Sequence, residues 1–244
     1  GARWTRNRDG TAAKVPADMS FDEWRDRFVQ NAPGKDFVEI FQPIGDYIRP
    51  DGNFDLDAAK ADYEKFLQTV PERNRMYLQQ AMTGVEYQQT KNLDAVFAYT
   101  AKKDTILFNP GHPMFSAYDL RAVMTHELGH RIDHTMFIQS WTSEAFSAAI
   151  TDARAVIDAD PQKFLAFAKS DVNGFLSDIL SAICEDNYRF DAFHEKSYWL
   201  KPGNKEKEIF ANLFSLETFG DKTSLNFFRE SFPGIWSEYS DFWK

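Results

Sequence analysis

Cysteine is nearly absent from this chain of 244 residues, in which Cys184 is the only one. A single cysteine excludes an intrachain disulfide and favours a reducing compartment. Its place inside an apolar stretch predicts a core residue rather than a nucleophile. Basic residues are also in deficit, because 28 Lys and Arg stand against 37 Asp and Glu and leave a net charge of -9. This charge excludes a general nucleic-acid binder, since a run of phosphates needs cationic partners.

Long apolar runs are missing as well. No stretch of the chain approaches the about 18 residues that a membrane-spanning helix needs, so we expect no membrane partner. A basic segment at residues 1–15 departs from the acidic balance, and we expect it to be a flexible arm. The chain begins Gly1-Ala2-Arg3 without Met, so we expect an excised part of a longer protein or a tag remnant.

Apolar residues are plentiful, with 23 Phe and a hydrophobic content of 43%. They suffice for one large domain, or for a catalytic core with an appended subdomain. Their spacing predicts helices from Ser20 onward and at 55–69, 71–83, 117–137, 142–158, 161–170, 174–186, 205–219, 222–231 and 233–243. Only 94–99 and 105–108 have a β-type pattern, around a turn that predicts a hairpin. The predicted fold class is therefore α+β and predominantly α.

The most informative stretch is residues 126–130, which read His-Glu-Leu-Gly-His. Positions four apart lie on one face of a helix, so His126 and His130 can offer two imidazole nitrogens to one Zn²⁺. Glu127 lies beside them as a base for the water that a catalytic zinc activates. With five His in the chain, about 0.006 such matches are expected by chance. The pattern therefore predicts a catalytic zinc site.

The helix around this motif is two-sided. One side is apolar and consists of Leu120, Met124, Leu128, Ile132 and Thr135. The other side is a polar stripe of His126, Glu127, His130, Asp133 and His134. Such a division predicts a helix whose back lies in a core and whose polar stripe faces a site.

A catalytic zinc ion usually has three protein ligands, so one ligand must lie outside the motif. A third His ten residues after His126 would give the metzincin pattern, but Met136 stands there and excludes that class. His134 lies about 12 Å along the helix axis from His126, and a straight helix cannot bring both to one metal. The third ligand is therefore expected on another element.

Carboxylates on the later helices are the candidates. Glu208 is favoured, because it leads an otherwise apolar helix where a carboxylate needs a partner such as a metal. Glu144 is the rival, although stabilisation of a helix N-terminus also explains it. Glu217, Glu185 and Asp178 remain as further alternatives.

Residues 126–133, together with Glu208-Ile209-Phe210-Ala211, resemble the gluzincin metallopeptidases related to anthrax lethal factor. More specifically, residues 15–244 are similar to a domain of phage minor head (head morphogenesis) proteins and bacterial toxin-like proteins. That second resemblance is carried by 16–24, the zinc helix, 176–179, His194 with Tyr198 and Trp199, and the Glu208 helix. The stretch from His130 to Glu208 is long for a lethal-factor-like enzyme, and its helices could carry a different ligand.

The resemblance implies a zincin-like core, with a small antiparallel sheet or hairpin packed on the motif helix and a C-terminal helical subdomain. It implies one metallopeptidase domain at 16–244, divided into 16–93, 94–137 and 138–244. It also implies Zn²⁺ as cofactor, Glu208 as third ligand, and Tyr198 and His194 as donors to the oxyanion of the reaction. A ligating His normally donates its second N–H to a carboxylate, for which Asp133 and Asp178 are the candidates.

These patterns predict a zinc-dependent endopeptidase with a polypeptide substrate, in which a strand edge near the metal could bind an extended peptide. The resemblance implies a phage-derived or toxin-like protein, whose partners are other phage head proteins or a host target. Its location would be the bacterial cytoplasm or the virion, or that of a delivered or secreted toxin. The alternatives are a non-catalytic virion protein with a structural or vestigial zinc site, and a helical binding domain without metal.

Overall fold

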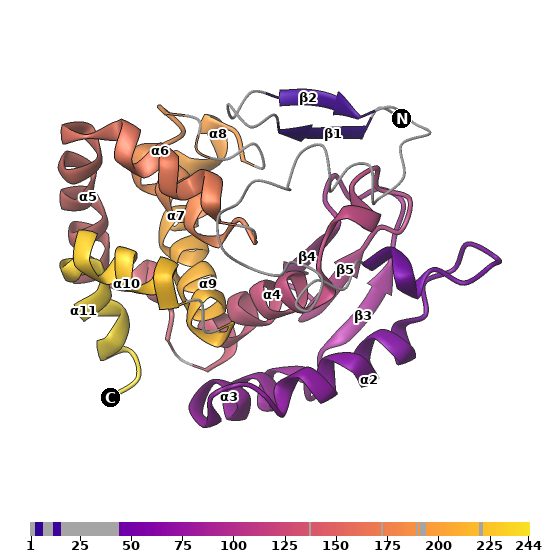
Figure 1. Cartoon of the computed structure of the whole chain (residues 1–244). Helices are drawn as coiled ribbons and strands as arrows, with labels where there is room; N and C mark the ends of the chain where they lie inside the picture. The colour runs from indigo at the N-terminus through magenta and orange to yellow at the C-terminus, as the bar shows by residue number, and fades with distance from the viewer. Residues whose placement is uncertain are drawn as a thin grey trace. The chain divides into compact units, whose positions relative to one another are not determined.

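The computed structural model describes residues 3–6, 12–15, 44–136, 138–171, 173–188, 190, 194–219 and 222–244 (Figure 1). The helix expected from Ser20 and the segment 16–24 lie outside these residues. The chain forms two compact units, Gly1–Arg131 and Ile132–Lys244. The boundary between them falls within one helix, α4 (Leu120–Thr135).

Two small sheets belong to the first unit. β1 (Arg3–Arg6) and β2 (Ala12–Val15) pair in antiparallel register. The second sheet has the order β3-β5-β4 and consists of β3 (Glu86–Gln89), β4 (Phe97–Thr100) and β5 (Thr105–Phe108). The antiparallel pair of β4 and β5 confirms the predicted hairpin, whereas β3 is parallel to β5 and makes the sheet mixed. Sequence patterning missed β3 because its Glu-Tyr-Gln-Gln stretch is mostly polar and exposed.

The helices of the first unit follow local signals. α2 (Leu56–Leu67) and α3 (Glu72–Met82) confirm the predictions at 55–69 and 71–83. α4 begins three residues later than the predicted start at 117, because Phe115–Ala117 forms a 3₁₀ turn. The carboxylate of Asp119 then accepts the backbone N–H of Arg121 at 2.8 Å. This is an N-cap, and it accounts for the later start.

An aromatic cluster fills the core of the first unit. The Phe54 ring lies 5.2–6.2 Å, between centroids, from the rings of Tyr47, Phe97, Phe108 and Phe115. These rings come from a loop, both hairpin strands and two 3₁₀ turns, η2 (Ile44–Tyr47) and η3 (Phe115–Ala117). Offset and edge-to-face contacts of this kind add to the free energy of burial. The hairpin is thereby held to the chain that leads into α4.

Within α4 the predicted division of the two sides is largely confirmed. Leu120, Met124, Leu128 and Ile132 are all buried, and only Thr135 of the expected apolar side is exposed. Thr135 is the last residue of the helix, so it lies where the buried stripe ends. The same burial pattern leaves both motif histidines partly exposed.

The regular elements among the described residues of the second unit are all helices. Its elements are η4 (Ser140–Thr142), α5 (Glu144–Ala159), α6 (Pro161–Ser170), α7 (Phe175–Cys184), α8 (Lys196–Trp199), α9 (Asn204–Thr218), α10 (Lys222–Ser231) and α11 (Pro233–Asp241). The predicted helices are confirmed, and the short helix α8 was missed. Every residue of α7 is buried, and α9 packs against it. The predominantly helical α+β class is confirmed, and none of the described helices is long and apolar enough to cross a membrane.

Cys184 is a buried residue of the second unit, and its burial can be tested by alkylation. Burial raises the pKa of its thiol to about 12, so the reactive thiolate is scarce in the folded protein. We expect iodoacetamide at about pH 8 to leave the native thiol unmodified while it alkylates the urea-unfolded chain fully, as measured by mass spectrometry. Equal labelling of the native and unfolded proteins would contradict the buried position.

Candidate metal centre

The two motif histidines lie on adjacent turns of α4 and face each other. Their Nε2 atoms are 3.0 Å apart, and the rings stand edge to face with centroids 4.6 Å apart. Two imidazole nitrogens on one tetrahedral Zn²⁺, at about 2.0–2.1 Å each, are separated by about 3.4 Å. The helix alone therefore brings His126 and His130 close to the separation that a shared metal ion requires.

Glu127 lies between the histidines in sequence and is only 7% exposed. Its Oε2 accepts the backbone N–H of Tyr99 at 2.6 Å. Tyr99 belongs to β4, which lies at an edge of the three-stranded sheet. This bond ties the motif helix to the hairpin, as the predicted packing requires. The sequence did not point to Tyr99, because the bond uses its backbone and leaves no side-chain signature.

In the second unit, Glu208 and Tyr198 are joined by a hydrogen bond. Glu208, on α9, is 4% exposed, and its Oε1 accepts the hydroxyl of Tyr198 on α8. Gly203 makes the turn between the two helices at a φ of 80°, a conformation that favours glycine. The Tyr198 ring in turn stacks on His194, with centroids 4.1 Å apart and planes 15° apart. Three predicted site residues thus lie together within this unit.

Asp178 orients His194 from the buried helix α7. Its Oδ1 lies 3.1 Å from Nδ1 of His194, and its Oδ2 accepts the side-chain amide of Asn212 at 2.6 Å. An ionised carboxylate can only accept, so the Nδ1 atom carries the proton and Nε2 is left as the second nitrogen of the ring. Asn212 was missed in the sequence, where its only signal was an amide inside the apolar run of α9.

The rival carboxylates have other partners or positions. Glu144 is exposed at the first residue of α5, where it complements the helix N-terminus. Glu185 pairs with Lys205 at 3.1 Å, and Glu217 accepts the hydroxyl of Tyr239 at 3.1 Å. These contacts account for all three side chains without a metal.

Asp133 and His134, at the end of the polar stripe, contact the loop that follows α4. Asp133 accepts both the backbone N–H and the hydroxyl of Ser140, at 2.7 and 2.6 Å. His134 is exposed, and its ring stacks on Trp141 with centroids 5.6 Å apart. The carboxylate of Asp133 therefore fastens the chain after the helix, whereas its sequence position had made it a candidate partner for His130.

Among the described residues, His126 and His130 of the first unit and Glu208 of the second each offer one atom that could ligate a metal ion. Two imidazole nitrogens and one carboxylate oxygen are a donor set that catalytic zinc sites use. The chemistry of these residues therefore fits the expected cofactor. Comparison with protein-family models, curated proteins and solved structures gave no match for this chain.

Proposed function

We propose that this protein is a zinc-dependent endopeptidase in which His126, His130 and Glu208 bind the metal and Glu127 is the general base. The observation that carries the proposal is the 3.0 Å separation of the two Nε2 atoms, with a buried carboxylate on the intervening residue. A purely structural zinc site has no use for a base at that position, so the arrangement favours a hydrolase.

The chain's own residues divide the work of peptide hydrolysis. A bound zinc ion would polarise the scissile carbonyl and lower the pKa of a water molecule toward neutrality. Glu127 takes the proton from the attacking water and returns it to the leaving amine. The N–H of Tyr99 holds one carboxylate oxygen of Glu127. This bond limits the rotation of the base and so favours one orientation for proton transfer.

Tyr198 and His194 are the proposed donors to the oxyanion that forms on the substrate carbonyl. The hydroxyl of Tyr198 is a donor in this structure, since it bonds to Glu208. The bond between Nδ1 of His194 and Asp178 sets the orientation of that ring. A stacked pair of this kind can present a hydroxyl and an imidazole side by side.

The hairpin supports a polypeptide as the substrate. Ala98 and Thr100 of β4 lie opposite Leu107 and Thr105 of β5, and the Tyr99 N–H is directed to Glu127 instead of into this ladder. Among the described strands, β4 has a neighbour on one side only. An extended peptide could add to this edge through backbone hydrogen bonds, which would align it with the motif helix.

The proposal is tested by metal analysis of the purified chain and by cleavage of a peptide library. We expect stoichiometric zinc, cleavage within the library peptides, loss of cleavage with a zinc chelator and its return when zinc is restored. Stoichiometric zinc without cleavage would overturn the peptidase and favour a structural site in a binding protein. Absence of zinc affinity would overturn both metal-dependent functions.

Replacement of Tyr198 by Phe separates two roles of its hydroxyl. If Tyr198 stabilises the oxyanion, kcat falls about 10²-fold and zinc affinity stays close to that of wild type. Steady-state kinetics and a zinc competition titration measure the two quantities. The matched control is Tyr188→Phe, which removes an exposed hydroxyl bonded to Asp158. A loss of zinc affinity with unchanged kcat would contradict the oxyanion role and assign the hydroxyl to the orientation of Glu208.

A further inference from the structure

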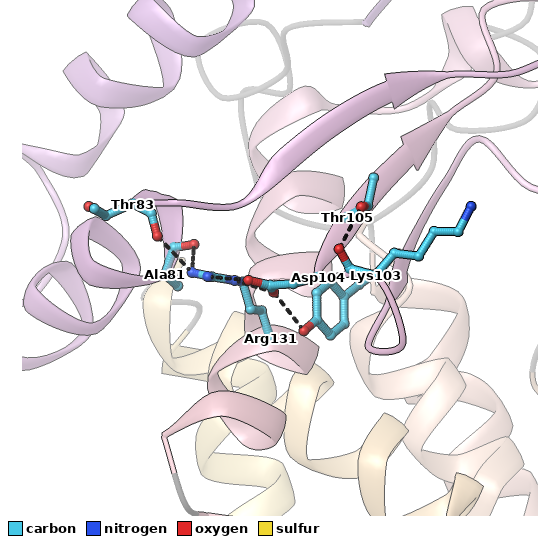
Figure 2. Close-up of polar contacts among 7 residues, drawn as sticks. Ala81, Thr83, Lys103, Asp104, Thr105 and Arg131 are labelled. Atoms are coloured by element: carbon cyan, nitrogen blue, oxygen red, sulfur yellow. Dashed lines mark hydrogen bonds and ion pairs between the residues drawn. The ribbon is translucent and has the colours of Figure 1, made fainter.

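Arg131 follows His130 directly on α4 and is almost completely buried, with 8% exposed. Its Nε and Nη2 donate to the two carboxylate oxygens of Asp104, at 2.7 and 2.6 Å (Figure 2). Its Nη1 donates to the backbone carbonyls of Ala81 and Thr83, at 2.5 and 3.1 Å. One guanidinium therefore joins the motif helix to the end of α3 and to the loop between β4 and β5.

Asp104 also contacts β4, the hairpin strand that bonds to Glu127. It stands just before β5 with a φ of 48°, a left-handed conformation that Asp tolerates better than most residues. The hydroxyl of Tyr99 donates to its Oδ1 at 2.9 Å. Tyr99 is thus held at both ends: its phenol bonds to Asp104, and its backbone N–H bonds to Glu127.

The helix period explains why both contacts reach the same hairpin. Glu127 and Arg131 are four residues apart in α4, so they lie on one face, one turn from each other. Glu127 bonds to the backbone of β4, and Arg131 bonds to the loop at the end of that strand. The two contacts fasten the strand to the helix at two points, which limits sliding and rotation of β4.

We propose that Tyr99, Asp104 and Arg131 form a clamp that positions the carboxylate of Glu127, with all three acting through the backbone N–H of Tyr99. This inference rests on the proposed function, in which Glu127 is the base that the clamp positions. β4 is an edge strand among those described, so it lacks the second neighbour that would restrain it. The bidentate pair of Arg131 and Asp104 supplies that restraint, and a fork-to-carboxylate contact does so with defined geometry.

Arg131 and Tyr99 keep their protons over the pH range in which a peptidase works. The hydrogen bonds to Asp104 raise the pKa of Arg131 above its already high value. Burial, followed by the bond to Asp104, raises the pKa of Tyr99. The guanidinium therefore stays charged and the phenol stays a donor, so the clamp is a fixed support for Glu127.

Two conservative variants open the clamp without removing the base. Tyr99→Phe removes only the hydroxyl, and Asp104→Asn removes the charge while keeping a side chain that tolerates the left-handed backbone. The matched control is Tyr47→Phe, because Tyr47 also donates its hydroxyl to an aspartate, Asp62, at 3.0 Å. The control thus loses the same kind of bond in the same unit of the chain.

The clamp is tested by the hydrogen-exchange rate of the Tyr99 amide, which NMR measures on the zinc-loaded full chain. We expect Tyr99→Phe and Asp104→Asn to exchange the amide of residue 99 at least about 10-fold faster than the control, as Glu127→Ala does. We expect kcat to fall about 10-fold in both, with zinc affinity equal to that of Tyr47→Phe.

The outcomes separate the clamp from the peptidase. Exchange and kcat equal to those of Tyr47→Phe would overturn the clamp and leave Arg131 as a purely structural link to α3. Faster exchange in a protein that binds zinc but cleaves no peptide would support the clamp and overturn the proposed function. Faster exchange together with a lower kcat supports both.

Discussion

We expect Glu127→Gln to lower kcat for peptide cleavage by about 10²–10⁴-fold, the range that a positioned general base contributes. The amide keeps the size of the carboxylate and can still accept the N–H of Tyr99, which Oε2 of Glu127 accepts at 2.6 Å. It cannot take a proton from water, so the loss falls on the chemical step and KM changes little. Steady-state kinetics on a peptide from the library that wild type cleaves measures the effect.

The control for this variant is Glu217→Gln, which changes a partly buried carboxylate that accepts the hydroxyl of Tyr239. We expect wild-type kinetics from the control and stoichiometric zinc in both proteins. Wild-type cleavage by Glu127→Gln would exclude Glu127 as the base. Loss of zinc from that variant would show instead that the carboxylate acts on the metal site.

Removal of Glu208 is the second large effect. We expect Glu208→Ala to lower zinc affinity by more than about 100-fold, because loss of a residue that only hydrogen-bonds to a metal ligand already costs 10–100-fold. The stabilisation that zinc gives wild type, about 2.7 kcal/mol at a free concentration of 100 times Kd, is lost with it. Competition with a chelating indicator measures the affinity, and thermal unfolding with and without zinc measures the stability. His126→Ala is expected to behave in the same way.

Glu144→Ala is the matched control for Glu208→Ala. Glu144 is the exposed first residue of α5, and it was the rival ligand in the sequence. We expect wild-type zinc affinity from this variant, with a small loss of stability of about 0.3–1 kcal/mol from the helix N-terminus. The reverse result, with zinc lost from Glu144→Ala and kept by Glu208→Ala, would refute the assignment of the third ligand.

Local patterns predicted much of this molecule correctly. The boundaries of α2 and α3 follow from the cap at Asp55, from Pro71 and from apolar spacing, which are properties of neighbouring residues. The start of α4 was predicted three residues too early, at 117, because Asp119 caps the helix just before Leu120. The phage or toxin setting rests on resemblance alone and stays a prediction.

β3 and α8 show where local patterns fail. The mostly polar strand β3 forms because it pairs in parallel with β5. Its own residues do not alternate between polar and apolar, so the sequence does not predict a strand there. α8 is a single short turn before Gly203, too short for a periodic signal. Both elements matter for the candidate site, since α8 carries Tyr198 and the sheet carries Tyr99.

The sequence by itself determined the pairing of His126 and His130, because a helix places residues four apart on one face whatever surrounds it. The 3.0 Å separation of the two Nε2 atoms is a consequence of that spacing. Only the tertiary structure decided the partners of these groups: Tyr99 for Glu127, Tyr198 for Glu208, and Asp178 with Asn212 for His194. Those partners are distant along the chain, and a hydrogen bond between distant residues depends on how whole elements pack.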